Sequence, residues 1–204
     1  MVVRSDMELG IASRLEAQFS FLLAADGLKS IIRANSVADG SRKENSAEHT
    51  WHVALMALVL AEHCPEPIDV GKVLTILIIH DLVEVYAGDA SIYDDEAVRG
   101  QADREEEAAR RMFQLLPVDQ CVSMASLWRE FEDRSSAEGR FARAVDALAP
   151  TWLHWGEHAH PSPAPLTAKR VMERKTKVLS SYPVLFELLE RVVNSALDRG
   201  LISP

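Results

Sequence analysis

Apolar residues recur at helical spacing along most of this chain. The first such segment, about residues 8–25, places its apolar side chains on one stripe of a helix: Leu9, Ala12, Leu15, Phe19, Leu22 and Leu23. The same period predicts helices over about 46–63, 70–86, 96–116, 119–133 and 135–155, followed by C-terminal helices within 167–200. No segment alternates apolar and polar residues in the manner of a half-buried strand. The pattern predicts an all-α bundle of about seven helices.

Capping residues indicate where several of these helices begin. Side chains suited to the N-cap position precede four of them: Asn45, Asp69, Ser135 and Thr167. Asn45 and Ser135 are each followed three residues later by Glu, which is the capping-box pattern. Pro183 suits the first turn of the last helix, and residues 161–165 are expected to form a loop. We expect a single domain over residues 1–204, with a core of about 15–155 on which the helices of 167–200 pack.

The predicted helix over 70–86 is apolar on nearly all sides, which is typical of a buried helix. It nevertheless carries His80, Asp81 and Glu84. At about 100° per residue, Glu84 lies about 40° and Asp81 about 100° from His80, so the three groups share one sector. Buried ionisable groups must be paired, neutralised or bound to a metal, because an isolated buried charge costs many kcal/mol.

An ion-pair network and a metal site both explain such a cluster. No Lys or Arg occurs between Lys72 and Arg99, so this segment offers no cation of its own. His49, in the first turn of an apolar helix, and Asp146, among apolar neighbours at helical spacing, are further candidate ligands. Each is weak evidence alone, but two imidazoles and two carboxylates make a mixed set that suits Mn, Co, Fe, Ni or Zn. Mg²⁺, which prefers oxygen ligands, suits it less.

Composition restricts the classes of partner and the compartment. The 204 residues carry a formal net charge of -9, which argues against a general nucleic-acid-binding surface. A small anionic substrate needs only a local positive site, and a metal ion supplies one. The sequence shows neither the apolar run of a signal peptide nor an apolar segment long enough to span a membrane. Its two cysteines are far apart. We therefore expect a cytoplasmic protein with no membrane contact.

The order of these residues resembles the HD superfamily of phosphohydrolases, and within it the 5'-deoxynucleotidase branch. The resemblance rests on three blocks: ENSAEH at 44–49, HDLVE at 80–84 followed by GD at 88–89, and SSAE at 135–138 leading to VD at 145–146. They cover roughly residues 15–153. The His-Asp pair alone is a weak motif, whereas the full HDLVE run with GD and both outer ligands is specific.

The resemblance implies the roles of the site residues. It implies that one divalent metal ion is held by four residues: His49, His80, Asp81 and Asp146. It makes Glu84 and Asp89 the acid–base residues and Arg33 the residue that binds the phosphate. Members with two metals carry extra His ligands between the His-Asp pair and the last Asp, and this chain has none from Leu82 to Pro150. A bacterial member of the branch has an aromatic residue after the Arg, where this sequence has Ala34.

The leading hypothesis is therefore a metal-dependent hydrolase that removes the 5'-phosphate from deoxynucleoside monophosphates with a metal-activated water. Glu84 and Asp89 would divide the base and acid roles, and the sequence does not assign them. One alternative is a phosphatase or pyrophosphohydrolase that acts on another small phosphorylated metabolite, which Ala34 favours. Another is a catalytically inactive nucleotide-binding HD module. The apolar excess on several helices, together with the resemblance, suggests a homodimer.

Overall fold

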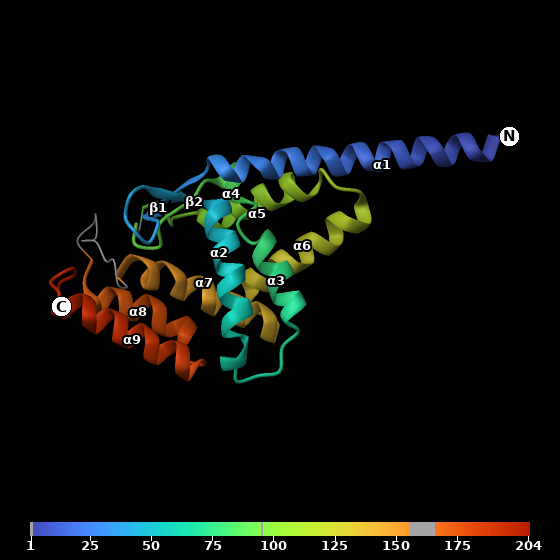
Figure 1. Cartoon of the computed structure of the whole chain (residues 1–204). Coiled ribbons are helices and arrows are strands. Elements are labelled where there is room, and N and C mark those ends of the chain that lie inside the picture. Colours follow the sequence, from blue (N-terminus) through green and yellow to red (C-terminus); the bar gives the residue numbers. More distant parts are fainter. Residues whose placement is uncertain (1, 95, 156–165) are drawn as a thin grey trace.

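The computed structural model describes residues 2–94, 96–155 and 166–204 as a bundle of helices with one small sheet (Figure 1). Its α-helices are α1 (Val2–Asp26), α2 (Ser46–Leu60), α3 (Val70–Ile79), α4 (Glu84–Ala87), α5 (Gln101–Phe113), α6 (Val118–Asp133), α7 (Ala137–Trp155), α8 (Ala168–Leu179) and α9 (Pro183–Asp198). Two 3-10 turns, η1 (Gly27–Ser30) and η2 (Ala61–His63), follow α1 and α2. The predicted all-helical class is confirmed, and the loop predicted at 161–165 lies outside the described residues.

A short hairpin between α1 and α2 was not expected from the sequence. Strands β1 (Ile32–Ser36) and β2 (Lys43–Asn45) pair antiparallel, with Ile32 opposite Asn45. The strands read IRANS and KEN, so they are short and mostly polar and carry no alternating apolar pattern. Backbone pairing forms this hairpin, and its two strands bring Arg33 and Glu44 to the site.

Three of the four predicted N-caps are present as expected. The Asn45 side chain accepts from the Glu48 amide (3.0 Å) and Glu48 accepts in return from the Asn45 amide (3.1 Å), which completes a capping box. Asp69 and Thr167 cap α3 and α8. The prediction at Ser135 is wrong by one residue, because Ser136 Oγ accepts the Gly139 amide (3.0 Å). Glu138 instead accepts the Asp69 amide (3.1 Å), which ties the starts of α3 and α7 together.

The helix predicted over 70–86 is broken, which corrects the sequence interpretation. α3 ends at Ile79 and α4 begins at Glu84, with i+3 turns between them, such as the Glu84 amide to the Asp81 carbonyl (2.9 Å). Gly88 ends α4 with a φ of 77°, a conformation that glycine adopts readily. Ile78 is 57% exposed, so α3 is not buried on all sides. The turn places His80 and Asp81 at the end of a helix instead of in its middle.

The core surrounds α7, which packs against α2, α3, α6, α8 and α9. The larger apolar cluster includes Val53 of α2, Ile76 of α3 and Leu148 of α7. A second cluster joins Phe21 of α1 to α5, α6 and the turn after α3. In Figure 1, α1 extends well beyond this body toward the N-terminus. Among the described residues, no helix is long and apolar enough to cross a bilayer.

Candidate metal centre

The four predicted metal ligands converge from α2, the turn after α3, and α7. The donor atoms of His49, His80 and Asp81 all lie within 4.8 Å of one another. Asp146 Oδ1 lies 3.0 Å from His49 Nε2 and 3.8 Å from His80 Nε2. His49 and His80 are buried, whereas the side chains of Asp81 and Asp146 remain 13% and 17% exposed. The structure therefore brings His49, His80 and Asp81 together, and Asp146 lies against the two imidazoles.

The hydrogen bond made by His80 orients its ring. Its Nδ1 lies 2.6 Å from the carbonyl oxygen of Leu77, one turn back along α3, so Nδ1 carries the hydrogen. Nε2 is the nitrogen left to act as a ligand; it is buried, makes no hydrogen bond among the described residues and lies 3.1 Å from Asp81 Oδ1. A metal-ligating His is normally held in this way through its other nitrogen. The uncommitted Nε2 is the observation that best fits a metal ion.

Glu44 faces the other nitrogen of His49 at ion-pair distance, without a hydrogen bond. Its Oε1 lies 3.5 Å from His49 Nδ1 and 3.6 Å from Arg33 Nε, and the residue is 3% exposed. Burial opposes a charge on His49, but the interactions with Asp146 and Glu44 raise its pKa to about 9. The centre is therefore short of positive charge, which a divalent ion would supply. Glu44 was not predicted as a site residue, because nothing in its spacing separates it from a surface Glu.

Arg33 joins the carboxylates beside the ligands. Its Nη1 lies 3.0 Å from Asp81 Oδ2, 3.2 Å from Glu84 Oε1 and 3.4 Å from an oxygen of Asp89. Burial opposes the charge, yet these carboxylates raise the pKa of Arg33 above its ordinary value. The segment between Lys72 and Arg99 holds no Lys or Arg, but the carboxylates do have a basic partner. It is Arg33 of β1, so the expectation that an ion-pair network lacks a cation is wrong. The site therefore combines an ion-pair network with residues that could bind a metal ion.

The two predicted acid–base carboxylates lie in different surroundings. Glu84 is buried and accepts a hydrogen bond from Ser46 Oγ (2.5 Å). Burial and the neighbouring Asp81 raise the pKa of Glu84 to about 8, although Arg33 and Ser46 oppose the shift. Asp89 accepts from the backbone amide of Ala34 (3.2 Å) and lines the adjacent pocket. Glu84 can therefore hold a proton near neutral pH, and Asp89 is better placed to meet a ligand.

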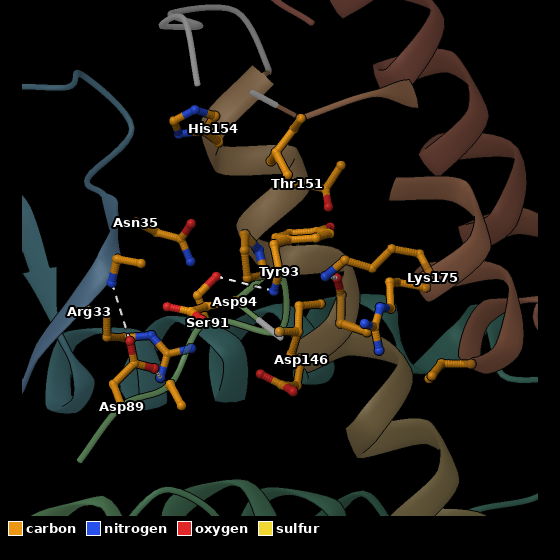
Figure 2. Close-up of a pocket in the computed structure, with 18 of the residues that line it drawn as sticks. Arg33, Asn35, Asp89, Ser91, Tyr93, Asp94, Asp146, Thr151, His154 and Lys175 are labelled. Atoms are coloured by element: carbon orange, nitrogen blue, oxygen red, sulfur yellow. Dashed lines mark hydrogen bonds and ion pairs between the residues drawn. The ribbon is translucent and has the colours of Figure 1, made fainter. Parts of the chain in front are cut away.

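A cavity of about 460 Å³ opens beside the centre. Figure 2 shows Arg33 and Asp89 at one side of it, Asp146 in the middle and Lys175 at the other side. Apolar parts of the lining come from Ala34, Ile92, Tyr93, Pro150 and Trp155. Asp146 is thus shared between the cluster of ligands and the cavity, so a molecule in the cavity would reach the metal centre directly.

A sequence profile of the family described as HD domain matches residues 25–184. Among curated proteins, 5'-deoxynucleotidase HDDC2 of Bos taurus is 32% identical over 127 residues, which are 62% of this chain and 60% of that protein. The Homo sapiens HDDC2 is 31% identical over 127 residues, covering 62% of this chain and 61% of that protein. The matches therefore span about three fifths of the length of these relatives.

Two solved structures extend the comparison to the whole fold. A predicted metal-dependent phosphohydrolase from Magnetospirillum magnetotacticum MS-1 is 40% identical, with a TM-score of 0.85 over 94% of this chain and 100% of that one. A conserved hypothetical protein from Pyrococcus furiosus is 26% identical, with a TM-score of 0.65 over 85% of this chain and 98% of that one. The similarity thus includes the C-terminal part of the chain, which lies beyond the motif-bearing segments.

Proposed function

Because this chain belongs to the HD domain family, we propose that it is a metal-dependent phosphohydrolase that removes the 5'-phosphate of deoxynucleoside monophosphates. The observation that carries the proposal is the buried, unpartnered Nε2 of His80 beside two carboxylates and a second imidazole. The curated relatives that match are named 5'-deoxynucleotidases, which supports this substrate class.

One divalent transition metal ion would be held by four residues: His49, His80, Asp81 and Asp146. Two nitrogens and two carboxylates suit Mn, Co, Fe, Ni or Zn better than Mg. When bound, such an ion lowers the pKa of a coordinated water toward about 7 and neutralises phosphoryl oxygens. The remaining steps fall to side chains around the ligands.

Glu84 and Asp89 would move the protons of the reaction. The raised pKa of Glu84, about 8, suits a group that exchanges a proton near neutral pH. One of the two carboxylates would take a proton from the attacking water, and the other would return one to the leaving 5'-oxygen. A general acid or base contributes about 10²–10⁴ in rate, so neither group acts alone in a reaction as slow as phosphate-ester hydrolysis.

Arg33 would bind the phosphate. In the structure its guanidinium contacts Asp81, Glu84 and Asp89, so it is held rigidly at the edge of the cavity. These contacts all involve Nη1, and a guanidinium has five N–H donors, so further donors of Arg33 could bind phosphoryl oxygens. The preorganised guanidinium would stabilise the charge of the transition state.

A phosphatase or pyrophosphohydrolase acting on another small phosphorylated metabolite is the second candidate. Ala34 lines the cavity with a small side chain at the position where a bacterial member of the branch has an aromatic residue. A small side chain at this position leaves room beside Arg33, which favours a different group next to the phosphate. An inactive nucleotide-binding module is less well supported, because it would not need Glu84 and Asp89 beside the ligands.

Substrate profiling separates these candidates. Metal-loaded protein should release phosphate from 5'-deoxynucleotides in preference to 5'-ribonucleotides and 3'-nucleotides. Activity on other phosphorylated metabolites without a preference for 2'-deoxynucleotides would instead support the second candidate. Tight nucleotide binding without hydrolysis under any divalent metal would support the inactive module.

We also propose that the protein acts as a homodimer. One stripe of α1 leaves four apolar side chains exposed: Leu15, Phe19, Leu22 and Leu23. Arg14 and Gln18 of α1 bond Asp119 and Gln120 of α6, so exposed Val118 and Val122 of α6 adjoin this stripe. A contiguous apolar surface of this kind marks an association site, and a second copy would cover it.

A further inference from the structure

One end of the cavity carries a positive charge that the proposed chemistry does not use. Lys175 reaches it from α8 and is 4% exposed. Its Nζ donates to the carbonyl oxygen of Ala147 (2.5 Å), the residue after Asp146. An ammonium group has three donors, and among the described residues this is its one hydrogen bond. Figure 2 shows the side chain extending from α8 toward the middle of the cavity.

The surroundings of Lys175 do not compensate its charge fully. Burial lowers its pKa to about 8, and Arg143 and Arg33 act in the same direction, whereas Asp146 opposes them. Arg143 itself lies 3.8 Å from both Asp146 and Glu132. A metal ion bound to Asp146 would neutralise much of the negative charge of that carboxylate. Less negative charge would then remain to offset the positive charges of Lys175 and Arg143.

A structural role alone does not require a lysine here. Pro150 lacks the amide that would bond the carbonyl of Asp146 four residues earlier, so α7 is weakened at this turn. Lys175 supports the neighbouring carbonyl of Ala147, but a neutral amide could do the same. Burying a charge is costly, so the charge itself calls for a partner. The open cavity is where that partner would lie.

The position of Lys175 separates it from the phosphate site at Arg33. Arg33 and Lys175 lie on opposite sides of Asp146 and line the same cavity (Figure 2). We propose that Lys175, with Arg143 nearby, binds a second phosphate group of the substrate. This proposal rests on the proposed function, because it assumes a scissile phosphate at the metal centre. The preferred substrates are then small metabolites with two separate phosphate groups, such as nucleoside 3',5'-bisphosphates.

Matched substrates test the proposal. Metal-loaded protein would be assayed with deoxyadenosine 5'-monophosphate and with deoxyadenosine 3',5'-bisphosphate. We expect kcat/KM for the bisphosphate to be at least about ten-fold higher, which is about 1.4 kcal/mol, mainly through KM. In Lys175→Met the ratio of the two kcat/KM values should fall at least about ten-fold. Lys177→Met, an exposed lysine on the same helix outside the cavity, should keep the wild-type ratio.

Lys175→Gln distinguishes charge from structure, because Gln can still donate to the Ala147 carbonyl. Loss of the preference in this variant supports the proposal, and a preference kept by Lys175→Gln overturns it. Equal losses on both substrates in Lys175→Met also overturn it, since Lys175 would then bind the scissile phosphate. Thermal melting of each variant identifies any that does not fold, in which case the other variant decides.

Binding of inorganic phosphate separates this proposal from the proposed function. Metal-loaded wild-type protein and Lys177→Met should bind two phosphate ions per chain, and Lys175→Met one. This result without hydrolysis of any nucleotide would reject the nucleotidase and keep the anion subsite. The opposite result is hydrolysis of nucleotides without a preference for the bisphosphate, with one phosphate ion bound per chain in both wild type and Lys175→Met. That result would reject the anion subsite and keep the nucleotidase.

Discussion

We predict that Glu44 is a positioning residue that acts on the proposed metal through His49. Its carboxylate faces His49 Nδ1 at 3.5 Å, which directs Nε2 toward the other ligands. Partners of this kind typically contribute about 10–100-fold to metal affinity. We predict that Glu44→Gln weakens metal binding by this factor, measured by competition with a chelator of known affinity. The exposed Glu62→Gln serves as control, and equal affinity in the two variants would rule out the positioning role.

Glu84 is predicted to serve proton transfer without holding the metal. Glu84→Gln keeps a group that can accept from Ser46 and loses the exchangeable proton. Turnover should fall by about 10²–10⁴-fold, while the metal content measured by elemental analysis stays at the wild-type level. Glu105→Gln is a control, because Glu105 is a half-buried carboxyl whose pKa is also raised by burial, and no ion pair joins it to Arg33 among the described residues. Near-normal turnover in Glu84→Gln would contradict the assignment.

At the level of single residues, the sequence pointed to the candidate metal ligands but not to Glu44 and Lys175, which lie next to them. The His-Asp pair and the distant His49 and Asp146 have apolar neighbours, so they stand out as polar groups in buried positions. Glu44 and Lys175 lie in polar segments, where a charged residue is unremarkable. Their burial arises only when β2 and α8 pack against the rest of the chain.

Among the elements, helix caps were more predictable than helix continuity. The capping box at Asn45 depends on residues three apart and is therefore local. The break between α3 and α4 is not local. In this turn Asp81 and Glu84 both accept hydrogen bonds from Arg33, which lies on a strand about fifty residues earlier in the sequence. The spacing of apolar residues cannot predict a contact of this kind. The β1–β2 hairpin escaped prediction for another reason, because its short, mostly polar strands carry no alternating apolar pattern.

The close approach of α6 and α7 at Gly139 predicts that a larger residue there destabilises the fold. A Cβ at Gly139 would lie 2.3 Å from the backbone oxygen of Glu130, so the two helices would have to separate. Overpacking of this kind costs about 1–3 kcal/mol, and we expect Gly139→Ala to lower the free energy of unfolding by that amount in urea titration. Ser123→Ala, at an exposed position of α6, should change it by less than about 0.5 kcal/mol. Unchanged stability in Gly139→Ala would disprove the close contact.

For the whole molecule, the exposed stripe of α1 predicts self-association. Phe19 and Leu23 are 62% and 78% exposed, and both lie on the stripe assigned to a second copy. The double variant Phe19→Glu, Leu23→Glu should sediment as a monomer where the wild type sediments as a dimer, because charges oppose burial of that face. Val184→Glu, an exposed apolar position on α9, should remain dimeric. A monomeric wild type at micromolar concentration would contradict the proposal.

Hydrolysis is predicted to depend on a metal ion held by His49, His80, Asp81 and Asp146. The most direct measurement is phosphate release from a 5'-deoxynucleotide by metal-stripped protein, before and after one equivalent of Co, Mn, Ni or Zn is returned, with Asp81→Ala alongside. We predict no release from stripped protein, recovery with at least one of these metals, and none from Asp81→Ala under any of them. Equal phosphate release by stripped and reloaded protein would contradict metal-dependent hydrolysis. So would release by Asp81→Ala equal to that of the wild type.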